Sequence, residues 1–146
     1  MLTETELDLL CLDSQICFSL YSATNAVVRA YRPLLEKLDL TYPQYLAMLV
    51  LWEKDGISVK EMGESLHLDS GTLTPLLKRL ALKGLVNRGR SETDERVRVL
   101  HITEAAHALK LEAGKVPDQM LCKIKMSAAK LNQLKALCDE VYSELS

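Results

Sequence analysis

The sequence predicts a mainly helical α+β chain with one small β-hairpin, and three observations lead to this fold class. Apolar residues recur at three-and-four spacing on both sides of one short region, as they do on buried helix faces. Within that region, residues 85–90 and 97–102 predict two strands, with apolar and polar residues alternating in the second. The chain has 146 residues, of which 48% are hydrophobic, which fits one domain with a substantial core.

The first third of the chain predicts three helices. A long apolar stripe without Gly or Pro predicts a helix over residues 6–31. Pro33 then predicts a break, followed by a short helix over residues 34–39. A hydroxyl cap followed by Pro43 begins a third helix, over residues 41–54.

Two shorter helices follow, joined by a tight turn. Ser58 is an N-cap for the first, and Asp69 or Ser70 can cap the second, which ends at Gly84. The second helix has an apolar stripe of Leu73, Leu76, Leu77, Leu80 and Leu82. The pair, followed by the hairpin, predicts a winged helix-turn-helix, whose second helix can enter the major groove of DNA.

The charge distribution supports DNA binding. Residues 70–102 contain seven basic and three acidic residues, a local charge of +4, whereas the whole chain carries −2. A basic helix and hairpin on an acidic body are typical of DNA readers, because phosphates are neutralised locally. Helix-helix-hairpin units with surface Lys and Arg also occur as protein-binding modules.

The two ends of the chain predict a homodimer. Thr103 begins a helix that Gly114 and Pro117 interrupt, and Ser127 caps the last helix. The terminal segments have long apolar stripes that one small domain cannot cover, and a symmetric dimer is the commonest solution. We therefore expect one domain over residues 1–146. Its dimerisation helices are expected at 5–38 and 103–146, and its winged region at 41–102, the alternative being a monomeric helical bundle with a winged edge.

Several classes of protein do not fit the sequence. The longest apolar run, residues 45–52, is far shorter than the roughly 20 residues of a membrane helix. The amino end is acidic where a signal peptide is basic, so we expect a cytoplasmic protein whose cysteines stay reduced. His and Cys show no metal-ligand spacing, and neither a phosphate loop nor a nucleophile elbow is present. We expect no metal, no cofactor, no membrane partner and no enzymatic activity.

Cys17 is a candidate for sulfur chemistry. A cysteine on an apolar helix face commonly packs as a small hydrophobic residue. Here Tyr21 lies one turn away, and phenols that donate to a thiolate favour its reactive, ionised form. Tyr31 is fourteen residues from Cys17, ~21 Å along a straight helix. A contact between them must therefore join two chains, unless the helix bends sharply.

The sequence resembles a known family. Residues 83–86 followed by 91–96 are similar to the wing of the MarR family of multiple-antibiotic-resistance regulators. Residues 17–21, 31–38, 41–45 and 68–79 resemble a peroxide-sensing branch of it, the organic-hydroperoxide-resistance regulators (OhrR). The resemblance extends from about Ser14 to Leu109.

The resemblance implies roles for individual residues. Cys17 is the expected redox sensor, supported by Tyr21 and, from the other subunit, by Tyr31 and Tyr42. Cys122 is the expected resolving cysteine of a two-cysteine type. Cys11 and Cys138 have no counterpart in the resemblance, and we expect both to be structural. The expected DNA-binding residues combine the family positions with nearby basic residues: Ser70, Thr72, Thr74, Lys78, Arg79, Arg88, Arg90, Asp94 and Arg96. Asp94 is expected to brace the wing, whose Arg96 enters the minor groove.

These roles imply a repressor that binds double-stranded operator DNA as a homodimer. Organic hydroperoxide would oxidise Cys17 to sulfenic acid, and Cys122 of the other subunit would then form an intersubunit disulfide that releases the DNA. One alternative is a MarR-type repressor released by a small aromatic or phenolic ligand bound among the tyrosines. Another is a thiol peroxidase, which would lack a basic residue beside Cys17 and would leave the winged region without a use.

Overall fold

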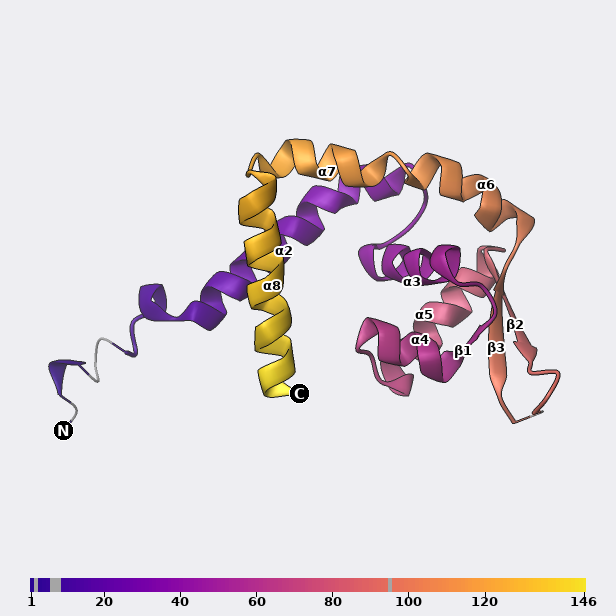
Figure 1. Ribbon diagram of the computed structural model, residues 1–146, viewed down its shortest axis with the longest axis horizontal. Helices are drawn as coiled ribbons and strands as arrows, with labels where there is room; N and C mark the ends of the chain where they lie inside the picture. The colour runs from indigo at the N-terminus through magenta and orange to yellow at the C-terminus, as the bar shows by residue number, and fades with distance from the viewer. Residues whose placement is uncertain (2, 6–8, 95) are drawn as a thin grey trace.

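The computed structural model describes residues 1, 3–5, 9–94 and 96–146, and it confirms the predicted fold class. Helices account for most of the chain, together with one small sheet (Figure 1). The elements in chain order are η1 (Leu12–Ser14), α2 (Ile16–Glu36), α3 (Tyr42–Glu53), β1 (Ile57–Ser58), α4 (Val59–Leu66), α5 (Ser70–Leu82), β2 (Val86–Arg90), β3 (Arg98–Ile102), α6 (Glu104–Ala113), α7 (Val116–Ile124) and α8 (Ala128–Leu145).

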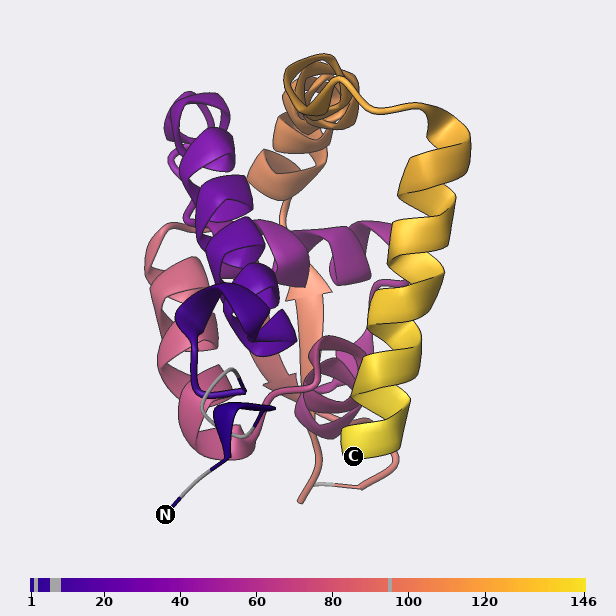
Figure 2. The same cartoon turned by 90° about the vertical axis from the view of Figure 1, so that its left-hand side faces the viewer.

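Helices α3, α4 and α5 pack with the sheet into one unit, which we call the winged body (residues 42–102). Helices α2, α7 and α6 lie along one side of it in Figure 1, and α8 runs down separately from the end of α7. Figure 2 shows α8 along the outside of the molecule, with its C-terminal end beside α4. Within the described residues, no helix combines the length and apolar composition needed to cross a membrane.

The sheet is antiparallel with strand order β1-β3-β2. Strands β2 and β3 form the predicted hairpin, which with its connection, residues 91–97, is the wing. Strand β1 was not predicted, because two residues are too few to show alternation. Ile57 of β1 pairs with Leu100 of β3, and this pairing attaches the wing to the start of the helix-turn-helix.

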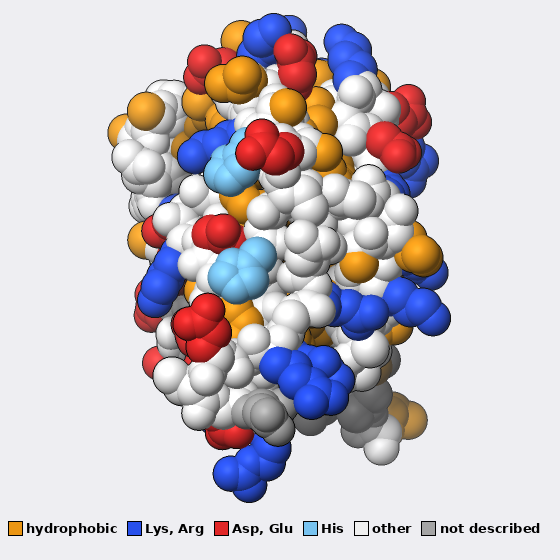
Figure 3. Space-filling model, turned by 90° about the vertical axis from the view of Figure 1, so that its right-hand side faces the viewer, with side chains coloured by type: hydrophobic (Ala, Val, Ile, Leu, Met, Phe, Trp, Pro, Cys, Tyr) orange, Lys and Arg blue, Asp and Glu red, His pale blue; other side chains and the backbone are white. Residues whose placement is uncertain are grey.

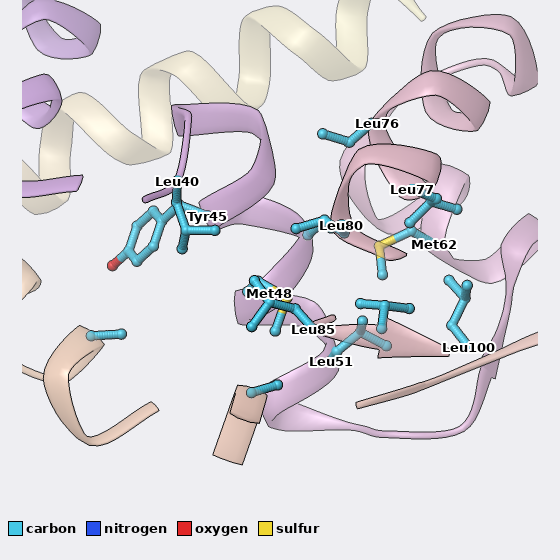
Figure 4. Close-up of a cluster of buried hydrophobic side chains, with 14 of the residues drawn as sticks. Leu40, Tyr45, Met48, Leu51, Met62, Leu76, Leu77, Leu80, Leu85 and Leu100 are labelled. Atoms are coloured by element: carbon cyan, nitrogen blue, oxygen red, sulfur yellow. The ribbon is translucent and has the colours of Figure 1, made fainter. Parts of the chain in front are cut away.

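The hydrophobic core lies where the three helices of the winged body meet the sheet (Figure 4). Side chains from α3, α4, α5 and β3 are almost fully buried there: Met48, Leu51, Met62, Leu73, Leu77, Leu80 and Leu100. Four of the five leucines predicted for the apolar face of α5 are buried, but the prediction for Leu82 was wrong, since it is 78% exposed. At about 100° per residue, position 82 lies on the far side of the helix from Leu73.

Side-chain caps fix most of the helix starts, as the sequence predicts. Thr41 and Gln44 form a capping box at α3, and Ser58 caps α4. Asp69 rather than Ser70 caps α5, accepting a hydrogen bond from the Thr72 backbone N–H at 2.7 Å. Thr103 and Ser127 cap α6 and α8 in the same way. Each cap satisfies a backbone N–H that has no partner within its helix.

The predicted N-terminal helices differ most from the structure. Residues 6–8 of the predicted first helix lie outside the described residues, and residues 9–15 contain only the short η1. Side chains compete with the helix there, because Ser14 Oγ and Gln15 Nε2 both donate to the Cys11 carbonyl. The break predicted at Pro33 is also absent, since α2 continues to Glu36. Proline removes one helical hydrogen bond, and burial of Leu35 offsets that loss.

The predicted apolar stripe of α8 is present but uncovered. No described residue of α8 is buried, and Leu134, Leu137, Val141 and Leu145 are between 41% and 83% exposed. A helix of 18 residues gains little stability from propensity alone, so its stripe needs a second surface.

Two leucines on α5 give a matched test of the core. Leu80→Ala removes a side chain with 0% exposure and should lower the free energy of unfolding by about 2–5 kcal/mol, through lost burial and a cavity. Leu82→Ala changes an exposed side chain on the same helix and should have little effect. Urea unfolding followed by circular dichroism at one fixed protein concentration measures both. Equal losses for the two variants would contradict the described orientation of α5.

Candidate functional site

The outer face of α5 carries the polar residues predicted to contact DNA. Ser70, Thr72, Thr74, Lys78 and Arg79 are all exposed, because the leucines of α5 face the core. The Thr74 hydroxyl donates to the Ser70 carbonyl at 2.7 Å, so this hydroxyl is held against its own helix. The structure thus places the five predicted residues together on the open side of the helix-turn-helix.

The wing has a braced turn. Asp94 Oδ1 accepts from the Arg96 backbone N–H at 3.0 Å and lies 3.5 Å from Arg96 Nε. The backbone N–H of Ser91 donates to the Val97 carbonyl at 2.9 Å and closes the base of the turn. The Arg96 side chain is 93% exposed. Asp94 therefore orders the turn while the Arg96 side chain projects from it.

Arg98 was missing from the predicted DNA-binding residues. It pairs directly with Arg90 across the wing, so their side chains lie on one face of the hairpin, and it lines a shallow hollow with Arg88. Like charges opposite each other are unfavourable, and none of these three arginines has an ion pair within the described residues. Figure 3, viewed from the side of the wing, shows Lys and Arg side chains without acidic neighbours at lower right. The charge of Arg98 is evident from the sequence, but its strand register is not.

Three tyrosines form a cluster between α2 and α3, which we call the phenol cluster. The ring centroids of Tyr31 and Tyr42 lie 4.7 Å apart, and Tyr45 lies 5.7 Å from Tyr31. Burial, with contributions from Tyr42 and Tyr45, raises the pKa of Tyr31 to about 12. Burial also raises the pKa of Tyr42 and of Tyr45. At neutral pH the phenols are therefore protonated, so they can donate hydrogen bonds to an anion.

Cys17 is exposed and lies in the first turn of α2, distant from the phenol cluster of its own chain. Because α2 is continuous from Ile16 to Glu36, the separation of ~21 Å between Cys17 and Tyr31 along the axis is maintained. Tyr21 is one turn from Cys17, but its side chain is 65% exposed and lies outside the phenol cluster. The structure does not bring the predicted sensor residues together within one chain.

Cys122 lies at the other end of α2. It is exposed on α7, which packs along α2, and its neighbour Lys123 donates to the Ala30 carbonyl at 3.0 Å. Cys122 is thus at the Tyr31 end of α2. Cys11 and Cys138 are also exposed, so neither packs in the core as a structural cysteine would.

An apolar groove lies between the start of α2 and α8. It is lined by Ile16 and Leu20 on one side and by Leu134, Leu137, Cys138, Val141 and Leu145 on the other, and its volume is about 530 Å³. Among the described residues, no group of three or more His, Cys, Asp and Glu side chains is placed to hold a metal ion.

Known proteins similar to this chain are regulators of transcription. The family model described as transcriptional regulator SarA/Rot matches residues 29–112. The organic hydroperoxide resistance transcriptional regulator of Bacillus subtilis is 48% identical over 133 residues, which cover 91% of this chain and 90% of the relative. The chain belongs to the OhrR branch of the MarR family. The predicted resemblance is therefore confirmed, and no enzyme family is indicated.

Two solved structures of AbfR from Staphylococcus epidermidis are also similar to this OhrR-type chain. Reduced AbfR bound to DNA is 29% identical, with a TM-score of 0.79 and 92% of each chain covered. Disulfide-formed AbfR is 28% identical, with a TM-score of 0.64, covering 97% of this chain and 94% of that one. The winged body and the additional helices therefore correspond to an established architecture, whereas the roles of individual residues stay predictions.

The phenol cluster should make stability depend on alkaline pH. Below pH 10.0 the Tyr31 phenol is protonated in both folded and unfolded chains, and as the pH rises toward about 12 only the unfolded chain ionises freely. The stability that the protonated Tyr31 phenol contributes is therefore fully present below pH 10.0 and is lost progressively as the pH rises toward about 12. Tyr31→Phe should reduce this loss without abolishing it, because Tyr42 and Tyr45 remain. Urea midpoints between about pH 9 and pH 11.5 measure the slope.

The control for this experiment is Tyr21→Phe, which removes an exposed phenol from the same helix. It should retain the wild-type dependence of the urea midpoint on pH. A wild-type slope in Tyr31→Phe would contradict the description of Tyr31 as a half-buried phenol with a raised pKa.

Proposed function

We propose that this chain is a cytoplasmic, redox-sensing transcriptional repressor that binds double-stranded operator DNA as a homodimer. Organic hydroperoxide oxidises Cys17, and a disulfide to Cys122 of the other subunit releases the DNA. The observation that carries the proposal is the placement of Cys17 at one end of a continuous α2, with the phenol cluster and Cys122 at the other. Only a second chain running in the opposite direction joins the two halves of this site.

The apolar groove supports the homodimer. In one chain the start of α2 and the stripe of α8 are exposed to water, including Ile16 at 72% and Leu137 at 53%. Burying apolar surface contributes roughly 25 cal/mol per Å², so a second copy that covers both helices is strongly favoured. A two-fold axis between the copies would place the start of each α2 near the Tyr31 end of its partner. We therefore keep residues 5–38 and 103–146 as the proposed dimerisation segments and 41–102 as the proposed DNA-reading region.

The sulfur chemistry proceeds in two steps, oxidation of Cys17 and formation of the disulfide. The Cys17 thiolate attacks one peroxide oxygen, the O–O bond breaks, and the alkoxide leaves and takes up a proton as an alcohol. The product at sulfur is a sulfenic acid. The Cys122 thiolate of the other subunit then attacks that sulfur, and hydroxide leaves and becomes water. Protonated phenols of Tyr31 and Tyr42 would stabilise the Cys17 thiolate by donating hydrogen bonds to it.

The disulfide would act on DNA through the dimer geometry. A two-fold protein reads two half-sites about one helical turn apart, so any change in the spacing of the two α5 helices weakens binding. Moving the dimer from almost fully competent to almost fully incompetent requires ~5 kcal/mol of differential stability. This chain is more similar to the two DNA-bound forms of AbfR, reduced and overoxidised, than to disulfide-formed AbfR, which supports a DNA-competent conformation here.

Cysteine variants test the redox proposal. After treatment with cumene hydroperoxide, wild-type protein should give a dimer band on a non-reducing gel, and Cys17→Ser and Cys122→Ser should not. Cys17→Ser should also remain bound to a DNA duplex, selected by the reduced protein from a random-sequence pool, after the same treatment. Binding should persist because the variant lacks the sulfur that starts the reaction. Fluorescence anisotropy measures this binding.

Cys138→Ala is the matched control, since it removes a thiol that the redox steps do not use and keeps a small apolar side chain in the groove. It should form the dimer band and release DNA as wild type does. Release of Cys17→Ser by a small phenol would instead support a ligand-sensing repressor. Repeated hydroperoxide turnover with excess dithiol would support a thiol peroxidase.

The wing arginines predict a salt dependence. Arg98→Ala should weaken binding to the same DNA duplex and reduce the slope of log affinity against log salt by about 0.9 per lost phosphate contact, or about 1.8 for a dimer. Lys135→Ala removes a basic residue from α8, where it pairs with Asp139 at 2.6 Å, and should leave the slope unchanged. An unchanged slope in Arg98→Ala would remove Arg98 from the DNA-binding surface.

A further inference from the structure

Gln44 is a buried polar side chain between the phenol cluster and the end of α5. It is 2% exposed and lies in the first turn of α3. Its Oε1 atom accepts a hydrogen bond from the Thr41 backbone N–H at 3.0 Å and another from Lys83 Nζ at 3.0 Å. Its own backbone N–H donates to Thr41 Oγ1 at 3.4 Å. One amide oxygen thus belongs both to the cap of α3 and to a contact with α5.

Lys83 is the C-cap residue of α5, and its ammonium group makes further contacts with the loop between α2 and α3. It donates to the Asp39 backbone carbonyl and lies 3.7 Å from the Asp39 carboxylate. Asp39 has a φ of 53°, a left-handed conformation in which few residues other than glycine are found. A lysine ammonium has three donors, and here three oxygen atoms surround it. Lys83 therefore joins the end of α5 to this loop and to Gln44.

The other side of the same cap meets the phenol cluster. Tyr42 follows the cap residue Thr41 as the first residue of α3, and its ring packs on that of Tyr31. Because the capping box fixes the backbone at the start of α3, a shift of the Tyr42 ring and backbone also shifts Gln44. A path therefore runs from Tyr42 along the first turn of α3 to Gln44, and from Gln44 by its hydrogen bond with Lys83 to the end of α5.

We propose that Lys83, through Gln44, is the positioning residue that couples the phenol cluster to α5. The inference rests on the proposed function, in which oxidation of the partner's Cys17 changes what Tyr31 and Tyr42 contact. In the reduced protein, Lys83 holds the end of α5 against the start of α3. After oxidation, the displaced start of α3 moves Lys83, and α5 moves with it. Neither Lys83 nor Gln44 contacts the reacting sulfur.

The test compares operator affinity before and after oxidation. Anisotropy with the selected duplex gives the dissociation constant of reduced and of cumene-hydroperoxide-treated dimer. The ratio of the dissociation constant after oxidation to that before oxidation measures the coupling. If this ratio is about 100 in wild type, it should be less than about 10 in Lys83→Met, within the usual range of coupling between sites. A non-reducing gel on the same samples should show as much disulfide as in wild type. A wild-type ratio in Lys83→Met would overturn the inference.

Three further variants separate coupling from loss of charge or of folding. Lys37→Met removes a nearby exposed lysine whose side chain makes no hydrogen bond or ion pair within the described residues, and it should keep the wild-type ratio. Gln44→Met keeps the side-chain volume but removes the shared acceptor, so it should behave like Lys83→Met. Gln44→Glu retains both acceptor contacts and should restore the ratio. Equal ratios for Gln44→Met and Gln44→Glu would contradict the role of the amide oxygen.

Hydrogen exchange on reduced protein distinguishes failure of this inference from failure of the redox proposal. Lys83→Met should raise amide exchange at both the end of α5 and residues 38–45, because its contacts join the two segments. Unchanged exchange in residues 38–45 would overturn the coupling, whatever hydroperoxide does. If this exchange rises but wild type binds DNA equally before and after oxidation, the redox function fails and the physical link between the segments stands.

Discussion

Helix α2 is one continuous helix from Ile16 to Glu36, and this fact limits every account of the sulfur chemistry. Each helical residue rises 1.5 Å, so Cys17 and Tyr31 of one chain are held ~21 Å apart. Pro33 does not relieve this constraint, because it lies beyond Tyr31 and leaves the helix unbroken. A thiolate that uses the phenols must therefore come from a second chain. Because a second chain is required, the exposed groove between α2 and α8 is the surface that we propose it covers.

The winged body can respond to a signal at α3 because it packs as one unit. Leu73, Leu77 and Leu80 attach α5 to the core shared by α3 and the sheet, and β1 attaches the wing to the same core. Close-packed interiors transmit displacement rather than absorb it. A small movement at the start of α3 would therefore be carried to α5 and the wing together.

Local rules predicted much of this fold, and long-range pairing accounts for what they missed. The caps at Thr41, Ser58 and Thr103 follow from neighbouring residues, so the sequence revealed them. Strand β1 and the placement of Arg98 opposite Arg90 depend on register between segments distant in the chain. The same limit applies to the site, since Lys83 and Gln44 are 39 residues apart and no spacing rule connects them. Family resemblance supplied Cys122, which no periodicity singles out.

In the proposed dimer, the exposed Cys17 would be one half of a composite site. A thiol that senses hydroperoxide must be reachable, and it also needs donors that lower its pKa. In a single chain these requirements are met in different places: Cys17 is exposed at the start of α2, and the phenols pack on one another with Tyr31 and Tyr42 half-buried. In a dimer, the phenols of the other chain would donate hydrogen bonds to Cys17, while the sulfur would stay outside the hydrophobic core of its own chain. The sensor would then be complete only in the dimer, which is also the form that can read two half-sites.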